Sequence, residues 1–460
     1  SSPCCLVQHQ MSILPFIAKL LELFRCPRRL LLSSERLPGN RRMESAPDAA
    51  WSYDVIQDSA DRCKYCHQLL SHSATHEELS RRLVENGVVC ARGGSQGSCA
   101  AAAFAAVDKG HFIRHLFAQA AVVDSENEWE NGGDDNNLID RGGLKRGKTS
   151  RRRHNIRVRL SGARFDATWR DLPTPDWTYL DTPIELPVGN CPDLFIQMSA
   201  PHVHATCLRL VEEHLRDTWG PACARDSSST IRVLDVGSGT GYMTVVMSKL
   251  FLEFLRADNS TAGLRSGAGT SFSLSVLGVE RVQEVQESTV RSLQDLALDG
   301  IIQGDPNTQL QGVKIATEQG GTAFRYSCGM KFPFEAGHTK SESFFELVVR
   351  LGDTEQDNLF DRANAFDLIH CGCALEAVPE KWKAALRPGG RLILPIGEAW
   401  SRQKLCAVDK LIGTSLESSY AIREHIPVTY VPFQKGVARS NCRESYWECA
   451  EQPAADDIYD

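Results

Sequence analysis

The stretch TIRVLDVGSGTGYMTVVMSKLFLEFL, Thr230 to Leu255, decides the fold class of this sequence. Ile231 to Val236 is a short run rich in aliphatic and β-branched residues, which is typical of a buried strand. Glycines then make a turn, and Tyr242 to Leu255 is long and apolar enough to predict a helix. A strand, a glycine-rich loop and a helix in this order predict the opening unit of a doubly wound α/β sheet.

The sequence on both sides continues this alternation. Further strands are predicted at Leu274–Val279, Phe345–Arg350, Phe366–Cys371 and Arg391–Ile396, with helices at Gln283–Leu298 and Glu376–Leu386. Upstream, a helix is predicted to follow MSAPHVH, and the stretch HEELSRRLVENGVV from His76 predicts another that stops at Gly87. We therefore expect an α/β, Rossmann-like sheet with helices on both faces.

The pattern predicts one elaborated domain. We expect a weakly structured extension at 1–75, the domain at 76–440, and a tail at 441–460. Polar insertions near 124–178, 256–273 and 300–343 interrupt the domain without the periodicity of a second one. The first insertion carries the acidic block DSENEWENGGDD and the basic block KRGKTSRRRHNIRVR, which indicate a solvated loop or, alternatively, a nuclear address or polyanion patch.

Composition narrows the class of protein. The chain has 460 residues, 42% of them hydrophobic, which is typical of a globular protein, and its net charge of -7 disfavours nucleic acid as a partner. The 16 cysteines lack the spacing of a disulfide framework, which favours a cytoplasmic location. The apolar run Met11–Phe24 contains Lys19 and Glu22 and is too short to span a bilayer. The arginine-rich region 11–42 leaves three readings open: organellar targeting, a poorly folded extension, or a segment upstream of a translation start at Met43.

Three predicted strands end in residues that suit an adenosine ligand. Gly237-Ser238-Gly239-Thr240-Gly241 follows the first strand, where backbone N–H groups can approach a ligand closely. Its third glycine comes one residue too early for a dinucleotide fingerprint, which favours adenosine with a short zwitterionic tail. Glu280 follows the second strand, where it suits the ribose hydroxyls, and Gly352-Asp353 follows the third, where it suits the adenine amino group. The alternative is three ordinary turns.

The sequence resembles the protein-L-isoaspartate (D-aspartate) O-methyltransferase family, a class I family that uses S-adenosylmethionine. The matching stretches run in the family's order from about His76 to Gln434: HEELSRRLVENGVV, YLDTPIELPVG, MSAPHVHATCLRLVEEHL, VLDVGSGTGYMT, VLGVERVQEVQEST, FDLIHCGCALEAVPEKWKAALRPGGRLILPIG and VTYVPFQ. The glycine loop is common to many methyltransferases, whereas the combination of SAPHVHA with RPGGRLILPIG and YVPF is specific to far fewer families.

The resemblance implies an activity, a cofactor and a partner. It implies methyl transfer from S-adenosyl-L-methionine, with S-adenosyl-L-homocysteine as product, to the α-carboxyl of L-isoaspartyl residues and, as a further acceptor, D-aspartyl residues in damaged proteins. The ester then closes to a succinimide, and its hydrolysis repairs part of the damage. We expect a monomer that binds such proteins and peptides, and neither nucleic acid nor a membrane. Because the acceptor is already an anion, the site has mainly to align and desolvate the reactants.

The resemblance also implies site residues. Asp181, Thr182, Pro183 and Ile184 fall on the substrate side, and the N-terminal helices form a substrate-side subregion. The cofactor side comprises Ile196, Gln197, Met198, Ser199, His204, Gly237, Ser238, Gly239, Thr240, Gly241, Glu280, Gly352 and Asp353. Ser199 matches the family's catalytic serine. It also suits the N-cap of the following helix, whose free N–H groups suit a carboxylate.

Other signals indicate packing or chance. His202 and His204 stand two residues apart, so on a helix they point in nearly opposite directions and one metal ion cannot easily take both; we predict no metal site. His202 and His370 are predicted to pack, and Cys371 and Cys373 to lie under the cofactor. The haem-attachment spelling Cys63-Lys64-Tyr65-Cys66-His67 is read as chance.

Two further readings concern the far end of the chain and the function as a whole. Gln434 and Arg439 differ from the family's usual residues and are left out of the predicted site. Two alternative functions stay open, a methyltransferase with another acceptor and a catalytically silent protein-binding module.

Overall fold

A computed structural model describes the protein at residues 73–89, 98–115, 155–160, 163–168, 176–188, 191–218, 228–262, 271–296, 311–316, 322–331, 342–355, 357–399, 401–412 and 420–437. The chain divides into two units, 1–50 and 51–460, and every described residue belongs to the second unit.

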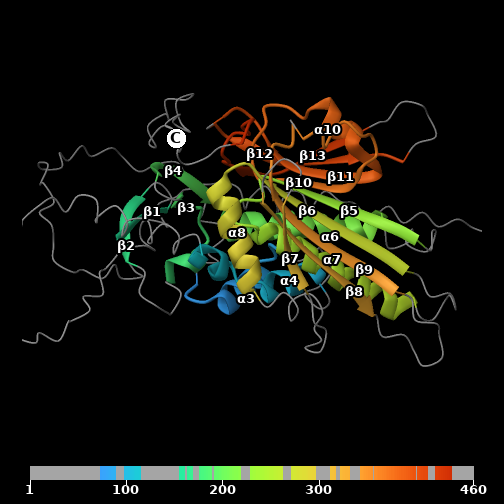
Figure 1. Ribbon diagram of the computed structural model, residues 1–460, viewed down its shortest axis with the longest axis horizontal. Helices are drawn as coiled ribbons and strands as arrows, with labels where there is room; N and C mark the ends of the chain where they lie inside the picture. Colours follow the sequence, from blue (N-terminus) through green and yellow to red (C-terminus); the bar gives the residue numbers. More distant parts are fainter. Residues whose placement is uncertain are drawn as a thin grey trace, which may run out of the picture. The chain divides into compact units, whose positions relative to one another are not determined.

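A nine-stranded sheet forms the core of the second unit (Figure 1). Its centre is parallel in the order β11-β10-β5-β6-β9, made of Leu386–Ile396, Phe366–Cys371, Ser228–Val236, Ser271–Glu280 and Glu342–Leu351. Antiparallel strands continue it on both sides, β12 and β13 beyond β11 and β8 and β7 beyond β9. These edge strands span Gln403–Lys410, Tyr420–Val428, Thr322–Lys331 and Gln311–Ala316. The five strands predicted from the sequence are the five parallel ones, so the predicted sheet is confirmed.

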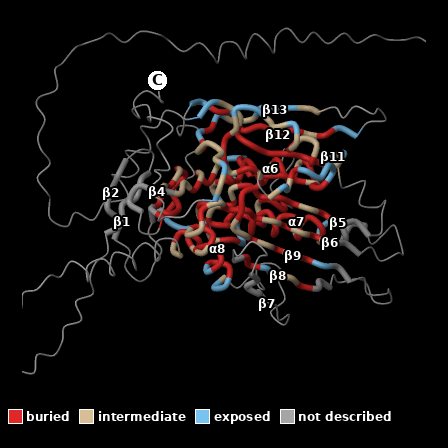
Figure 2. The backbone as a smooth tube through the Cα atoms, turned by 45° about the horizontal axis from the view of Figure 1, so that its top comes forward, coloured by how far each residue is buried: buried red, intermediate tan, exposed pale blue. Residues whose placement is uncertain are grey.

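Helices cover both faces of this sheet, as predicted. Alternate residues of β5 enter two different hydrophobic clusters, Ile231 and Val233 the first and Leu234 and Val236 the second. The first cluster is shared with α3, α4, α6, α7 and α8, which span His76–Glu85, Cys99–Ala106, Pro201–Thr218, Tyr242–Ala262 and Gln283–Asp295. The second contains Trp382 of the short helix α10, Glu380–Ala385. Burial on both faces explains why the central strands read as nearly continuous apolar runs, and Figure 2 shows them buried while β13 is largely exposed.

Some helix ends differ from the prediction. Helix α7 continues to Ala262, seven residues past the predicted end, and α8 ends at Asp295. Helix α10 begins only at Glu380, because Pro379 disfavours helical backbone at the residue before it. At the N-terminal helix α3 the prediction holds, since Leu79 and Leu83 are fully buried and Gly87 has a φ of 69° just past the end.

The predicted insertions contain strands that the sequence pattern did not reveal. Strands β1 and β2, Asn155–Leu160 and Ala163–Thr168, lie in the first insertion and pair with each other. With β3 and β4, Ile184–Val188 and Cys191–Met198, they form a four-stranded antiparallel sheet in the order β2-β1-β3-β4. Strands β7 and β8 lie in the third insertion. Reading Asp124 to Arg159 as a solvated loop was therefore wrong for residues 155–159, which belong to β1 and whose charged side chains mask the strand signal.

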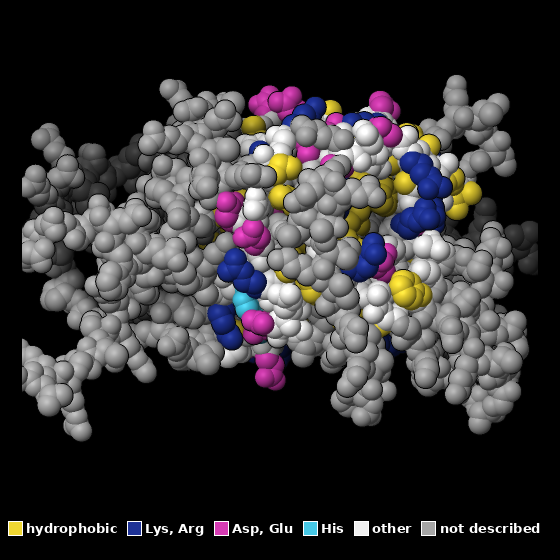
Figure 3. All heavy atoms as spheres, in the orientation of Figure 1, with side chains coloured by type: hydrophobic (Ala, Val, Ile, Leu, Met, Phe, Trp, Pro, Cys, Tyr) yellow, Lys and Arg dark blue, Asp and Glu magenta, His cyan; other side chains and the backbone are white. Residues whose placement is uncertain are grey.

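None of the helices in the described part of the chain is long and apolar enough to cross a membrane. On the face drawn in Figure 3, basic and acidic side chains of the described residues lie interspersed.

Candidate functional site

The glycine loop joins β5 to α7 at the carboxyl end of the parallel strands. The backbone N–H groups of Gly237 and Ser238 donate to the Val279 carbonyl at 2.9 and 3.1 Å, which ties the loop to the end of β6. Gly241 has a φ of 80°, and a Cβ on it would meet Cγ2 of Thr289 at 2.5 Å. Only glycine fits this position without displacing α8.

Glu280 ends β6 beneath the loop. Its two carboxylate oxygens accept hydrogen bonds from the backbone N–H groups of Gly239 at 2.9 Å and Val282 at 2.8 Å. Burial raises the pKa of the Glu280 carboxyl, and these two N–H groups hold back part of the rise. The sheet therefore fixes one carboxylate against the glycine loop, where the sequence predicted it.

Gly352 and Asp353 follow β9 at the same edge of the sheet. The Gly352 N–H donates to the Glu280 carbonyl at 3.0 Å, which keeps the second and third strand ends together. The Asp353 carboxylate accepts hydrogen bonds from the backbone N–H groups of Glu355 and Gly436. The strand ends thus meet as predicted, and a late segment of the chain joins them.

That late segment, residues 430–436, is called the C-terminal strap here. The Gln403 side chain bonds the backbone N–H and carbonyl of Tyr430, and Ala374 exchanges backbone hydrogen bonds with Val431 and Phe433. Gln434 accepts a hydrogen bond from the Arg281 guanidinium at 2.7 Å.

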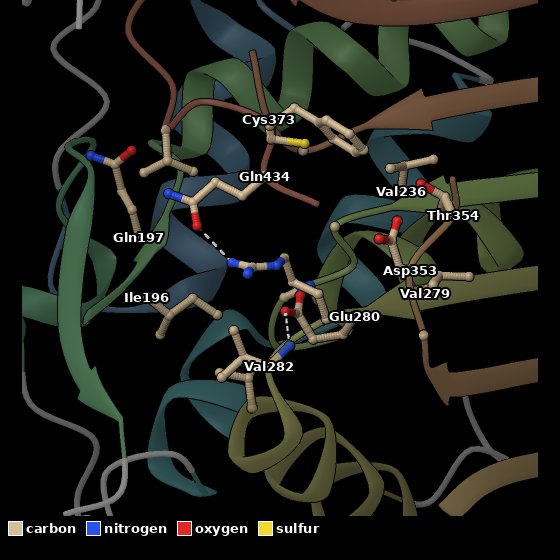
Figure 4. Close-up of a pocket in the computed structure, with 18 of the residues that line it drawn as sticks. Ile196, Gln197, Val236, Val279, Glu280, Val282, Asp353, Thr354, Cys373 and Gln434 are labelled. Atoms are coloured by element: carbon tan, nitrogen blue, oxygen red, sulfur yellow. Dashed lines mark hydrogen bonds between the residues drawn. The ribbon is translucent and has the colours of Figure 1, made fainter. Parts of the chain in front are cut away.

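A cavity lies between the strand ends and the strap, and Figure 4 shows the side chains that point into it. One side carries Glu280, Asp353 and Thr354, and the strap contributes Val431, Pro432, Phe433 and Gln434. Leaving Gln434 out of the site was therefore wrong, because the strap brings it into the wall; Arg439 lies outside the described residues.

A second cavity adjoins the first. The two share Ile196, Gln197, Gly237, Gly239 and Gly372, and the second adds Met198, Ser199, His204, Asp235, Ser238, Thr240, Tyr242, Met243, His370 and Tyr430. The predicted cofactor residues line one cavity or the other, except Gly241, which packs against Thr289. Together the two cavities collect residues from β4, from the glycine loop and from the ends of β5, β6, β9 and β10.

Ser199 faces the second cavity but is not the N-cap of α6. The helix begins at Pro201, and the Ala200 carbonyl accepts from the N–H groups of Val203 and His204. The His202 N–H donates to the Asp181 carboxylate at 2.8 Å. Because Pro201 has no N–H, the first turn offers no free donor for a carboxylate, contrary to the sequence expectation.

The Ser199 hydroxyl instead hydrogen-bonds Tyr430. Burial raises the pKa of the Tyr430 phenol well above its ordinary value, and the hydrogen bond with Ser199 acts in the opposite direction. Ser199 therefore connects β4, which ends at Met198, to the C-terminal strap across the second cavity.

The residues predicted on the substrate side lie behind the cavities. Asp181, Thr182 and Ile184 are buried, Pro183 is half-buried, and none of the four lines either cavity. Asp181 also lies 2.9 Å from Nδ1 of His202, which gives His202 the supporting position that was predicted for it. Contact of the four residues with a substrate stays a prediction.

His370 does more than pack. Its Nδ1 lies 2.7 Å from the Asp235 carboxylate, whose other oxygen accepts a hydrogen bond from Thr244. Burial acts to lower the pKa of His370, but the hydrogen bond and charge of Asp235 outweigh it and hold that pKa well above its ordinary value. A protonated imidazole paired with a carboxylate thus lines the second cavity. The sequence contained both residues but no signal that adjacent strands would align them.

Cys373 lines the first cavity, as the prediction of small residues under the cofactor requires. Its Sγ lies 3.3 Å from that of Cys371, and both thiols are free. The hydrogen bond with Cys371 and burial raise the pKa of the Cys373 thiol well above its ordinary value. Cys373 therefore presents an uncharged thiol to the cavity.

Three buried polar atoms of the second cavity have no hydrogen-bond partner among the residues that the structure describes: His204 Nδ1, Ser238 Oγ and Tyr242 Oη. Buried polar atoms are nearly always paired, so these three indicate a polar ligand group. Burial lowers the pKa of His204 well below its ordinary value, which leaves a neutral ring able to donate or accept. Within the described residues, no group of three or more His, Cys, Asp or Glu side chains is arranged to hold a metal ion, and Cys63–His67 lies outside them.

Comparison with known proteins gives concordant matches. The sequence model of the family described as protein-L-isoaspartate(D-aspartate) O-methyltransferase (PCMT) matches residues 168–324 and 331–438, more than half of the chain. Protein-L-isoaspartate O-methyltransferase 1 of Arabidopsis thaliana is 28% identical over 254 residues, covering 55% of this chain and 74% of that protein. The protein-L-isoaspartate O-methyltransferase of Triticum aestivum is 25% identical over the same shares. A solved structure of a candidate protein-L-isoaspartate O-methyltransferase of Plasmodium falciparum, in complex with S-adenosyl-L-homocysteine, has 16% identity and a TM-score of 0.40, covering 79% of this chain and 99% of that one. Because a TM-score of 0.40 is too low to assign a fold, the fold assignment rests on the strand order of the nine-stranded sheet.

Proposed function

The chain belongs to the protein-L-isoaspartate (D-aspartate) O-methyltransferase family, and we propose that it methylates the α-carboxyl of L-isoaspartyl residues in damaged proteins, with D-aspartyl residues as a further acceptor. The methyl donor is S-adenosyl-L-methionine and the product is S-adenosyl-L-homocysteine. Closure of the ester to a succinimide then starts the repair of the isomerised backbone.

One observation carries the proposal: two neighbouring cavities at the ends of the parallel strands share five lining residues. The first has acidic groups at the ends of β6 and β9, which suit the hydroxyl and amino donors of an adenosine. The second has Ser199 and the unpaired polar atoms. A donor with its adenosine in the first cavity and its amino-acid tail in the second would pass the residues that both cavities share, and an acceptor held at Ser199 would meet its methyl group there.

The residues present fit the cofactor. Glu280 suits the ribose hydroxyls and Asp353 suits the adenine amino group. The loop Gly237–Gly241, with His204 and Ser238, suits the amino-acid tail, because the unpaired donors and acceptors there match the charged groups of the tail. When bound, S-adenosyl-L-methionine supplies an electrophilic methyl group. The apolar wall of Ile196, Val236, Val279 and Val282 excludes water from the adenosine.

The acceptor needs orientation more than proton transfer. An isoaspartyl α-carboxyl is ionised at neutral pH, so the protein has no proton to remove before the methyl is transferred. The Ser199 hydroxyl is a hydrogen-bond donor available to one carboxylate oxygen, and Tyr430 fixes where that hydroxyl lies. The protonated His370, balanced by Asp235, adds a positive group to the same cavity. We assign Ser199 the catalytic positioning role.

A labelling experiment tests this function. The full chain is incubated with methyl-labelled S-adenosyl-L-methionine and two peptides of one sequence, one with L-isoaspartate and one with L-aspartate, and base-labile methyl ester is counted. We expect ester on the isoaspartyl peptide alone. Equal labelling of both peptides would indicate another carboxyl acceptor, and no labelling with no cofactor binding would indicate a silent module.

The partner and compartment predictions belong to this proposal. Damaged proteins and peptides are the partners that the family implies, and the interspersed surface charges of Figure 3 offer little to a nucleic acid. Six cysteines of the described part of the chain are free thiols, which supports a reducing, cytoplasmic compartment. The monomeric state and the division into an extension, a domain and a tail stay predictions.

A further inference from the structure

We propose that Arg281 is a positioning residue that latches the C-terminal strap across the adenosine cavity and thereby sets how fast the cofactor exchanges. The inference rests on the proposed function for the identity of the ligand. The latch itself is inferred from hydrogen bonds between residues of the protein.

The Arg281 guanidinium contacts three successive residues of the strap. It donates to the Gln434 side-chain oxygen at 2.7 Å, the Gly436 carbonyl at 2.7 Å and the Lys435 carbonyl at 3.4 Å. A planar guanidinium suits this task because its N–H groups point outward in a fixed fork. Arg281 directly follows Glu280, so the residue predicted to bind the ribose and the residue that holds the strap are adjacent in the chain.

Two separate sets of contacts hold the strap. At Tyr430, Val431 and Phe433 it is held by Gln403 and by Ala374. Beyond Phe433 it is held by Arg281 and by Asp353, which accepts from the Gly436 N–H. The part of the strap that faces Glu280 and Asp353 across the cavity therefore depends on side chains from the ends of β6 and β9.

The strap is also a wall of the cavity. Pro432, Phe433 and Gln434 line it opposite Val279 and Glu280, and Figure 4 shows Gln434 reaching toward the latch contact above Glu280. An adenosine held between these walls leaves more readily when one wall moves away. Weakening the latch should therefore speed ligand release without altering the acceptor cavity around Ser199.

Arg281 also affects the pKa of Glu280, and the test must separate this effect from the latch contacts. Burial raises the pKa of Glu280, and the charge of Arg281 counteracts that rise. Arg281→Lys retains the charge but loses the fork, whereas Arg281→Ala loses both. Gln434→Ala removes one latch contact from the strap side and leaves the charge beside Glu280 intact.

The first measurement needs no ligand. Hydrogen exchange of the backbone amides at 430–437 is compared in the full-length wild type, Arg281→Ala, Arg281→Lys and Gln434→Ala. Arg291→Ala is the matched control, because Arg291 is a half-exposed arginine of α8 whose ion pair with Glu287 is remote from the strap contacts. We expect faster exchange at Gly436 in Arg281→Ala, a smaller effect in Arg281→Lys and Gln434→Ala, and none in the control. Unchanged exchange in Arg281→Ala and Gln434→Ala would overturn the latch.

The second measurement follows dissociation of S-adenosyl-L-homocysteine by stopped flow. We expect about a tenfold faster release from Arg281→Ala and a higher KM for S-adenosyl-L-methionine, with the KM for the isoaspartyl peptide unchanged. Faster exchange with an unchanged release rate would overturn the role in cofactor retention. If the wild type binds no S-adenosyl-L-homocysteine, the proposed function fails, whereas the exchange comparison still decides whether the latch exists.

Discussion

Asp181 accepts hydrogen bonds from His202 twice at one oxygen, from the backbone N–H at 2.8 Å and at 2.9 Å from Nδ1 of the ring. The carboxylate lies 20 residues before the helix it caps and is almost fully buried. This arrangement leaves Ser199 free of the capping role, so its hydroxyl is available to the cavity.

Replacing Asp181 should therefore affect stability. Asp181→Ala removes the acceptor for a first-turn N–H of α6, and we expect the free energy of unfolding to fall by about 1 to 3 kcal/mol. Urea titration measures it. Asp217→Ala is the control, because Asp217 is an exposed residue of the same helix and its loss should change the unfolding free energy by less than about 0.5 kcal/mol. Equal effects of the two variants would show that the capping contact contributes nothing.

Ser199→Ala should lower activity much more than stability. We expect kcat/KM for the isoaspartyl peptide to fall by about tenfold or more, because the variant loses the hydroxyl proposed to contact the acceptor, while losing the hydrogen bond to Tyr430 lowers the free energy of unfolding in urea by no more than about 1 kcal/mol. Ser401→Ala, at an exposed serine, controls for the substitution itself. A loss of stability with unchanged kcat/KM would assign Ser199 a structural role.

Gly241→Ala tests the close approach of the glycine loop to α8. The added Cβ would meet Thr289 Cγ2 at 2.5 Å, at a backbone φ of 80°. Gly87→Ala is a matched control, because its φ is 69° and nothing lies within 4 Å of its Cβ. We expect Gly87→Ala to lower the unfolding free energy by about 1 kcal/mol from backbone strain alone, and Gly241→Ala to lower it by at least about 2 kcal/mol.

A second substitution separates the steric contact with Thr289 from backbone strain as causes of the lost stability. Thr289→Ser deletes Cγ2, so Gly241→Ala should be less destabilising in that background. If the two changes simply add in a thermal or urea double-mutant cycle, the steric explanation is wrong.

His214 should make the protein acid-sensitive. Burial and the charge of Arg391 lower its pKa to about 3, against 6.5 for an unperturbed histidine. Because the folded protein binds this proton less readily than the unfolded chain, stability falls as the pH drops from about 6.5 toward 3. We expect His214→Gln to have a flatter dependence of unfolding free energy on pH across this window.

The hydroxyl of Thr218 lies 3.3 Å from His214 Nδ1 and offers a control. Thr218→Val removes that contact but no titrating group, so it should retain the slope of the wild type. A His214→Gln profile parallel to the wild type would show that other groups dominate acid unfolding.

The central strands and the cofactor residues were predictable for one physical reason. Parallel strands buried on both faces require apolar runs such as Ile231–Val236, and their carboxyl ends must meet, so Glu280 and Asp353 could be placed together without a structure. What could not be predicted depends on partners distant in sequence. The charged strand NIRVRL is recognised only by its pairing with β2, and the role of Asp181 depends on a helix that begins 20 residues later. Likewise Gln434 lies in the cavity wall beside Arg281, a residue 153 positions earlier in the chain.

The strap also bears on when the site can exist during synthesis. Glu280 precedes Gly436 by more than 150 residues, and a chain emerging from the ribosome presents the ends of β6 and β9 long before the wall that faces them. Synthesis adds roughly 5 to 20 residues per second, and a domain generally folds as a unit. A nascent chain that stops short of residue 430 therefore has the glycine loop and both acidic residues but no closed adenosine cavity. Ligand binding can stabilise the protein only after translation has passed the strap.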